Sequence, residues 1–207
     1  MTKLLTLCTL LLALVLQAQT PDQIKKLPAP DKDGGMSLMK ALSLRKSSRS
    51  FNTIPLTDKQ VSNLLWAANG FNRDNLRTAP SAMNSQEIEV YMARKDGLWF
   101  YDAKAHSIIM IHNKDIRKET GLQPFVGEAP VNLIFVADKT KPKNPQVFEK
   151  YADADAACCA ENAYLYCASA GLACVLRGAF RSDILSSAMQ LPSTKIPIFC
   201  MTVGQPK

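Results

Sequence analysis

The sequence predicts an α+β fold in which helices cover both faces of a mostly antiparallel sheet. Three observations support this prediction. Apolar residues recur at helical spacing in some stretches, and they alternate with polar residues in others that are joined by short turns such as 95–97. A nearly continuous apolar run over 130–137 is typical of a strand that is buried on both faces.

Two helices are predicted in the N-terminal half. The first, over 37–45, begins at Ser37 and has a basic C-terminal end. It is expected to bury Leu38, Ala41, Leu42 and Leu44. The second begins at Thr57, which forms a capping box with Gln60, and it ends at Asn69-Gly70. Its core-facing positions are Val61, Leu64, Leu65 and Ala68.

The middle of the chain predicts strands. Alternation over 87–92, a turn, and apolar runs over 98–101 and 107–112 indicate an antiparallel meander. The apolar run 130–137 is expected at the centre of the sheet.

Helices and strands then alternate to the end of the chain. A helix over 153–170 is apolar around most of its circumference, so we expect it to be buried. A strand over 173–176, a helix over 181–189 and a strand over 196–203 follow.

The first residues have a separate character. Lys3 and an apolar run over 4–16, which is short for a membrane span, are typical of a secretory signal peptide over 1–19. Residues 20–35 are rich in proline and glycine, and they predict an extended, mobile linker. The folded domain is expected over 36–207.

Composition narrows the function. With 207 residues, 47% of them hydrophobic, the chain can form one domain with a sizeable core. The net charge of +7 comes from separate basic groups, a pattern that does not favour nucleic-acid binding. The two histidines and the lack of a Cys-x-x-Cys pattern argue against a zinc site. Outside the signal, five cysteines are expected as free core thiols, with disulfides as the alternative.

Two short segments, 45–49 and 77–86, carry the candidate site. The first holds three cations and two hydroxyl groups, which suits a phosphate monoester because guanidinium groups can donate to two phosphate oxygens at once. The second is a turn rich in small polar groups. Each segment also has a simple alternative, a solvated helix end for the first and an ordinary loop for the second.

The pattern Arg-x-Ser-x-Arg, followed by a capped helix and then Pro-Ser-Ala-x-Asn-Ser-Gln, resembles the FMN-dependent nitroreductase family over about residues 38–204. Within it, the branch with the SagB-type dehydrogenases is the most similar. The resemblance implies a three-layer α-β-α sandwich and a homodimer that holds FMN between its subunits. The implied FMN contacts are Arg45, Lys46, Ser47 and Arg49, then Pro80, Ser81, Ala82 and Asn84 from the partner, and finally Leu176, Arg177 and Gly178.

Two positions depart from the family pattern. Many relatives have an acidic residue where Arg177 stands. This departure matters little if only the backbone amide is used, and the alternative is a changed charge beside the flavin ring. The basic residues that many relatives carry beyond Gly204 are missing, and Lys207 is expected in solvent. Asn84 has an alternative as a turn residue that bonds to its own backbone.

The implied function is a ping-pong FMN oxidoreductase that reduces nitro or quinone-like compounds with NAD(P)H. No side chain is assigned as a catalytic acid, base or nucleophile, because the cofactor carries the hydride. An exported, periplasmic protein would need another electron donor, since NAD(P)H is scarce outside the cytoplasm. The alternatives are therefore a SagB-like dehydrogenase, a non-enzymatic flavin-binding scaffold and an anion-binding surface protein.

Overall fold

The computed structural model describes residues 23–207, and its core is a seven-stranded sheet in the order β1–β6–β5–β4–β7–β9–β8. All neighbouring strands are antiparallel. The sheet strands are β1 (Ile24–Lys26), β4 (Ile88–Arg94), β5 (Gly97–Asp102), β6 (Ser107–His112), β7 (Val131–Asp138), β8 (Ala173–Arg177) and β9 (Lys195–Gly204). A separate hairpin joins β2 (Phe71–Arg73) and β3 (Leu76–Arg77).

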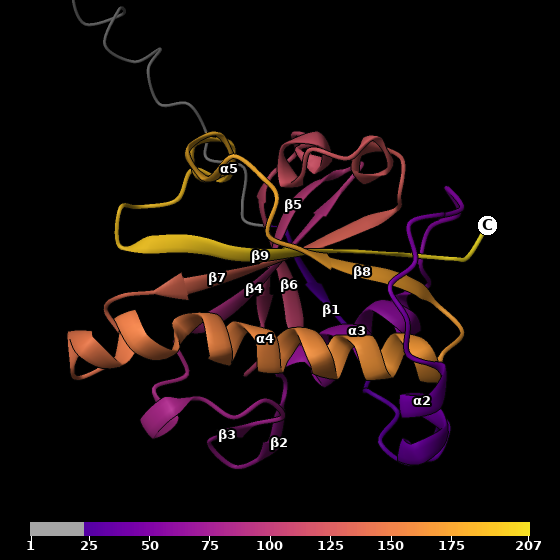
Figure 1. The fold of residues 1–207 in the computed structure, drawn as a ribbon, viewed down its shortest axis with the longest axis horizontal. Helices are drawn as coiled ribbons and strands as arrows, with labels where there is room; N and C mark the ends of the chain where they lie inside the picture. The colour runs from indigo at the N-terminus through magenta and orange to yellow at the C-terminus, as the bar shows by residue number, and fades with distance from the viewer. Residues whose placement is uncertain (1–22) are drawn as a thin grey trace, which may run out of the picture.

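Helices lie on both faces of the sheet, as Figure 1 shows. The helices are α2 (Leu38–Leu44), α3 (Asp58–Asn69), α4 (Pro145–Ser169) and α5 (Ser182–Met189), with the 3-10 turns η1 (Ala82–Asn84), η2 (Arg117–Thr120) and η3 (Pro124–Gly127). The helices α3 and α4 cover one face, whereas α5, η2 and η3 cover the other. The predicted three-layer α+β fold is confirmed.

Two hydrophobic layers form because alternate residues of each strand point to opposite faces. On β4, Val90 and Met92 pack toward α3 and α4, whereas Tyr91 packs toward α5. Every residue of β7 is buried, since both faces of this strand are covered. The predicted meander and the buried strand are therefore confirmed.

The long helix α4 begins at Pro145, eight residues before the predicted start. Asn144 caps it by accepting a hydrogen bond from the Gln146 amide at 3.0 Å, and proline is favoured in the first turn. The helix is also less enclosed than predicted, because Asp153, Ala157 and Glu161 are exposed along one side. Four of the five described cysteines are buried, and all five are free thiols.

The predicted burial of α2 is largely wrong. Only Ala41 is buried, whereas Leu38 is 62% exposed and Leu42 is 45% exposed. The helix lies at the C-terminal end of α4, where it meets the rest of the protomer on a single side (Figure 1). The apolar side of α2 therefore lacks a partner within the described protomer.

The predicted linker over 20–35 is wrong for its described part, 23–35. Strand β1 pairs with β6 at the edge of the sheet. Beyond it, the Pro28 carbonyl accepts a hydrogen bond from the Ser62 hydroxyl at 2.6 Å, and the Asp31 amide donates to Asn63 Oδ1 at 2.8 Å. These contacts fix the segment to α3. The proposed signal peptide over 1–19 lies outside the described residues.

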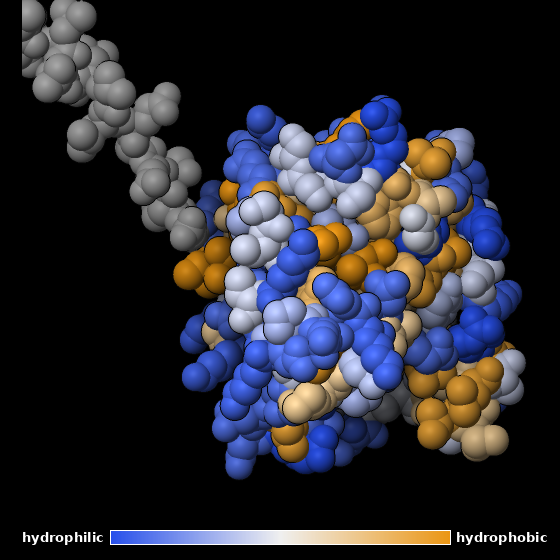
Figure 2. All heavy atoms as spheres, turned by 60° about the vertical axis from the view of Figure 1, so that its left-hand side comes forward, coloured by the Kyte–Doolittle hydropathy of each residue, from blue (hydrophilic) through white to orange (hydrophobic). Residues whose placement is uncertain are grey.

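No helix within residues 23–207 is both long enough and apolar enough to span a membrane. On the face shown in Figure 2, apolar side chains form separate groups among hydrophilic ones.

The capping box at the start of α3 gives a stability prediction. The Gln60 amide donates to Thr57 Oγ1 at 3.2 Å, and the Thr57 amide donates to Gln60 Oε1 at 2.9 Å. We expect Thr57→Ala to lower the free energy of unfolding by about 1 kcal/mol, because one helix amide loses its acceptor. Urea denaturation measures the change. Thr57→Ser keeps the oxygen, and an equal loss in this variant would contradict the capping explanation.

Candidate functional site

Residues 45–50 follow α2 and have no regular secondary structure. The chain leaves the helix at Arg45, where ψ is 124°. Arg45 and Ser47 contact Tyr164 of α4. Lys46, Ser48 and Ser50 line a cavity of about 350 Å³. Tyr164 lines the same cavity, so Arg45, Lys46 and Ser47 all lie around this side chain.

Tyr164 connects this segment to the end of β8. Its hydroxyl lies 2.8 Å from Ser47 Oγ and accepts a hydrogen bond from the Leu176 amide at 2.7 Å. The Arg45 guanidinium lies 5.3 Å from the centre of the Tyr164 ring, in cation–π range. Leu176 lies two residues before Gly178, so two of the three predicted contact segments are adjacent in one protomer. The sequence analysis missed Tyr164; the sequence signal is a tyrosine in an otherwise apolar stretch of α4.

The cations of this region have no carboxylate partner within the described residues. Arg45, Lys46 and Arg49 form no ion pair there. Lys207 lines the same cavity as Lys46, and the Asn52 amide fixes the adjoining chain end by donating to the Gln205 carbonyl at 2.9 Å. The uncompensated positive charge suits a phosphate group.

The third predicted segment, with Pro80, Ser81, Ala82 and Asn84, lies elsewhere on α4. The Ala82 amide donates to Asp155 Oδ2 at 2.8 Å. Asp155 precedes Tyr164 by nine residues, which is about 13 Å along a helix axis. Figure 1 likewise shows the β2–β3 hairpin and α2 below different parts of α4. Within one protomer, the turn is therefore separate from the segments around Tyr164.

A pair of buried carboxyl groups supports this turn. Glu87 is fully buried, and its Oε2 accepts a hydrogen bond from Ser85 Oγ at 2.5 Å. Burial, assisted by the neighbouring Glu87, raises the pKa of Asp155 to about 6. The sequence analysis assigned no role to either residue. The available signal was Asp155, one of two aspartates at the start of the otherwise apolar stretch 152–160, which lies on the same helix face as Ala152 and Cys159.

Arg177 points away from Tyr164, into the opposite layer. Its guanidinium donates to the Thr120 carbonyl at 2.6 Å and to Thr202 Oγ1 at 2.9 Å, and the residue is 6% exposed. A Cβ on Gly121 would lie 1.8 Å from Nη1, so this close approach requires a glycine. The Arg177 side chain is therefore held within the fold, which leaves its backbone as the part available to a ligand.

Gly178 follows β8 and is exposed. A Cβ added there would lie 3.9 Å from the Phe199 ring, which is an ordinary contact. Internal packing therefore does not explain the glycine, and the open backbone leaves room for a planar group to approach.

The fold and these groups define a class of protein: a three-layer α+β protein with a phosphate-suited segment beside an open strand end. The model of the nitroreductase family matches residues 42–205, and the chain belongs to this family. A candidate nitroreductase of known structure from Ralstonia eutropha JMP134 is 44% identical, with 91% of each chain covered and a TM-score of 0.84.

Two further relatives agree. A candidate nitroreductase from Methanocaldococcus jannaschii is 29% identical over 184 residues, which is 82% of this chain and 91% of the relative. The structure of a candidate NADH dehydrogenase or NAD(P)H nitroreductase from Parabacteroides distasonis ATCC 8503 shares the fold, with 20% identity, coverage of 83% and 88%, and a TM-score of 0.60. The family match makes the protein an oxidoreductase of a family that generally uses a flavin and acts on small molecules.

The buried position of Arg177 generates a second stability prediction. Arg177→Ala should lower the free energy of unfolding by about 3 kcal/mol, because several buried acceptors lose a charged donor. Thermal or urea unfolding measures this loss. Arg181→Ala is the matched control, since its side chain is 66% exposed. A loss for Arg177→Ala no larger than for the control would contradict the structural role.

Proposed function

We propose that the protein is an FMN-dependent oxidoreductase that takes electrons from NAD(P)H and reduces nitro or quinone-like compounds. One observation carries the proposal. The Tyr164 hydroxyl contacts both Ser47, in the cationic segment after α2, and the Leu176 amide, near the exposed end of β8. The cations of this segment therefore lie close to the end of the strand. A ligand with a phosphate at one end and a flat ring at the other fits this arrangement.

Each part of the site has a task in this proposal. Arg45, Ser47 and Arg49 bind the phosphate and the ribityl chain, because guanidinium groups donate to two oxygens at once. Lys46 adds positive charge from the neighbouring cavity. The backbone at Leu176–Gly178 lies against the ring, without a contribution from the Arg177 side chain. When bound, FMN supplies the group that accepts and passes on the hydride.

The proposal includes a homodimer in which the partner supplies the turn over 80–84. Two features support it. In its own protomer the turn contacts α4 at Asp155, about 13 Å along the helix from Tyr164, and a second copy would bring another such turn to the site. In addition, the apolar side of α2 and Met83, which is 83% exposed, are uncovered in the protomer.

We also propose export to the periplasm, on the basis of the apolar run over 4–16. An exported protein requires a reductant other than cytoplasmic NAD(P)H, so the physiological donor is a separate question from the chemistry of the site.

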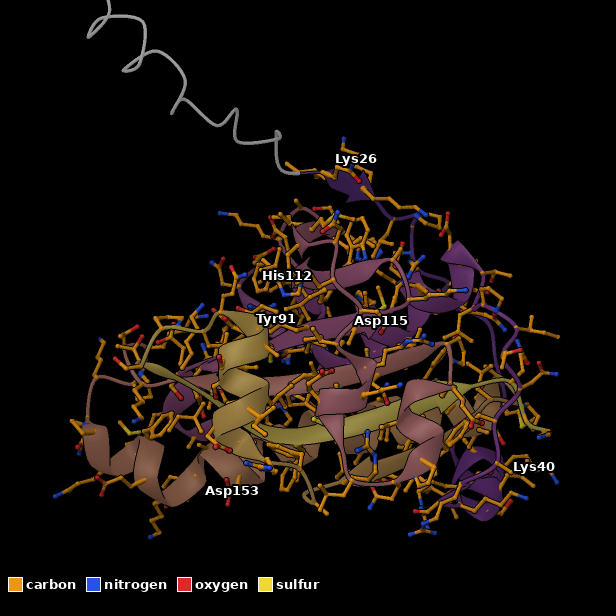
Figure 3. The ribbon with its side chains drawn as sticks, turned by 90° about the horizontal axis from the view of Figure 1, so that it is seen from above. Lys26, Lys40, Tyr91, His112, Asp115 and Asp153 are labelled. Atoms are coloured by element: carbon orange, nitrogen blue, oxygen red, sulfur yellow. The ribbon has the colours of Figure 1, made fainter. Side chains whose placement is uncertain are left out.

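The first functional prediction concerns the phosphate. Arg45→Ala and Arg49→Ala should each weaken FMN binding about tenfold or more, because each removes a charge-assisted hydrogen bond. Fluorescence quenching of FMN on titration with protein measures the dissociation constant. Lys26→Ala removes the same charge on β1, at the opposite edge of the sheet from β8 (Figure 3), and should leave affinity unchanged. Equal weakening in all three variants would indicate a general charge effect and not a site.

The second prediction concerns turnover. Purified protein loaded with FMN should show a flavin absorption spectrum that bleaches on anaerobic addition of NADH or NADPH and returns when a nitro or quinone compound is added. A spectrum that bleaches only with an artificial donor would favour the dehydrogenase. Bound flavin that no donor reduces would favour the scaffold protein. Failure to bind FMN would contradict the proposal.

A further inference from the structure

The turn after β3 has a strained backbone. Met83 and Asn84 both have φ of 53°, and Gln86 has φ of 50°. Residues other than glycine adopt this left-handed conformation at a cost of about 1 kcal/mol each, and asparagine tolerates it best. Such a shape persists only where surrounding contacts hold it. Met83, at the centre of the turn, is held with its side chain 83% exposed.

Two carboxyl groups hold the opposite ends of this turn. Asp155 Oδ2 accepts from the Ala82 amide at 2.8 Å, where the turn begins. Glu87 Oε2 accepts from the Ser85 hydroxyl at 2.5 Å, where the turn ends. Within the turn, the Asn84 amide donates to the Ser81 carbonyl at 3.0 Å, and the Gln86 amide donates to Ser81 Oγ at 2.9 Å. Asp155 and Glu87 thus fasten both ends of the turn to the core.

The Ser85 hydroxyl also lies 2.9 Å from the Ala82 carbonyl, so the two fastened ends are close together, and Glu87 helps burial to raise the pKa of Asp155. Neighbouring carboxyl groups can bond to each other only when one of them carries a proton. Glu87 is fully buried, and its Oε1 has no other partner among the described residues. A proton on Asp155 gives this oxygen the donor that it lacks.

No cation replaces that proton within the described residues. Neither carboxyl group forms an ion pair there. The nearby Arg77 donates to Gln86 Oε1 and to the Asn69 carbonyl. The thiols of Cys158 and Cys159 on α4 are the other titratable groups close by, and burial raises the pKa of Cys159, so this thiol stays neutral.

We propose that Asp155 is a positioning residue, which shares one proton with Glu87 and thereby fixes the turn over 81–84 in the shape that it presents to the flavin site of the partner protomer. The role at the flavin rests on the function proposed above. The role in the turn stands on the contacts of the protomer alone.

The proposal gives the turn a pH dependence of defined sign. The pKa of Asp155 is raised to about 6, so the shared proton is present below that pH and is lost as the pH rises through it. Above this pH Asp155 has lost its proton and places a negative charge in a buried position beside the Glu87 carboxyl group. The clamp on Ala82 and Ser85 then loosens, and the strained turn is free to relax.

Asp155→Asn is the informative variant. The amide oxygen still accepts from Ala82, and the amide nitrogen can donate to Glu87, so the variant imitates the protonated pair at every pH. Glu87→Gln places the donor on the other side of the pair and serves as a second test if the first variant does not fold. Asp153→Asn is the matched control, because Asp153 is exposed on the outer side of the same helix (Figure 3).

The first measurement uses the full chain without flavin. Hydrogen exchange of the Ala82 amide, corrected for its intrinsic pH dependence, should become about tenfold faster between about pH 5 and about pH 7 in the wild type and in Asp153→Asn. It should stay constant in Asp155→Asn. Equal exchange behaviour in all three proteins would overturn the clamp.

The second measurement links the clamp to the flavin. The phosphate of FMN itself titrates near pH 6, so the readout is the ratio of the FMN dissociation constants of wild type and Asp155→Asn. This ratio should rise about tenfold between about pH 5 and about pH 7 if binding requires the shared proton. A constant ratio, with the expected exchange behaviour, would overturn the role at the flavin. Absence of FMN binding in every variant would instead refute the proposed function, and the exchange data would still decide whether the carboxyl pair holds the turn.

Discussion

The arrangement of the site depends on one hydrogen-bonding group, the hydroxyl of Tyr164. Strand β8 lies at the edge of the sheet, where outward-facing amides have no neighbouring strand. Tyr164 reaches from α4 to accept the hydrogen bond of the Leu176 amide, and the same oxygen contacts Ser47. Two residues before Leu176 on the same strand, the Cys174 carbonyl accepts a hydrogen bond from the Ser48 amide at 2.8 Å. These hydrogen bonds therefore hold the cationic segment along β8, and they also give the outward-facing backbone groups of this edge strand their partners.

Those parts of the fold that local chemistry determines could be predicted from the sequence. The capping box of Thr57, the alternation in β4 and the apolar run of β7 each depend on residues close together in the chain. The exposure of α2 could not be predicted, because an apolar helix face does not show whether another part of the same protomer covers it. The attachment of 23–35 depends on Ser62 and Asn63, far along the chain, so its proline-rich composition was misleading.

The candidate site likewise has parts that the local sequence predicts and parts that depend on contacts between distant residues. The cations around Ser47 and the turn over 80–84 were visible as local composition. The direction of Arg177 was not, because it depends on the donor geometry of a buried guanidinium among acceptors from η2, β7 and β9. Tyr164 and Asp155 lie on one helix and were both missed, since helical periodicity identifies a buried face and gives no partner for the polar groups on it.

The pairing of β1 with β6 has a consequence for any shortened form of the chain. Residues 24–26 occupy the hydrogen-bonding positions on the outer side of β6, at the end of the sheet opposite β8. A form that begins at residue 36 would keep all the candidate flavin contacts but would expose a bare strand edge at residues 107–109, next to Ile111, which is already 41% exposed. Exposed edges of this kind add strands from other molecules. A low yield or aggregation of such a form would therefore reflect an uncovered sheet, and not a missing cofactor.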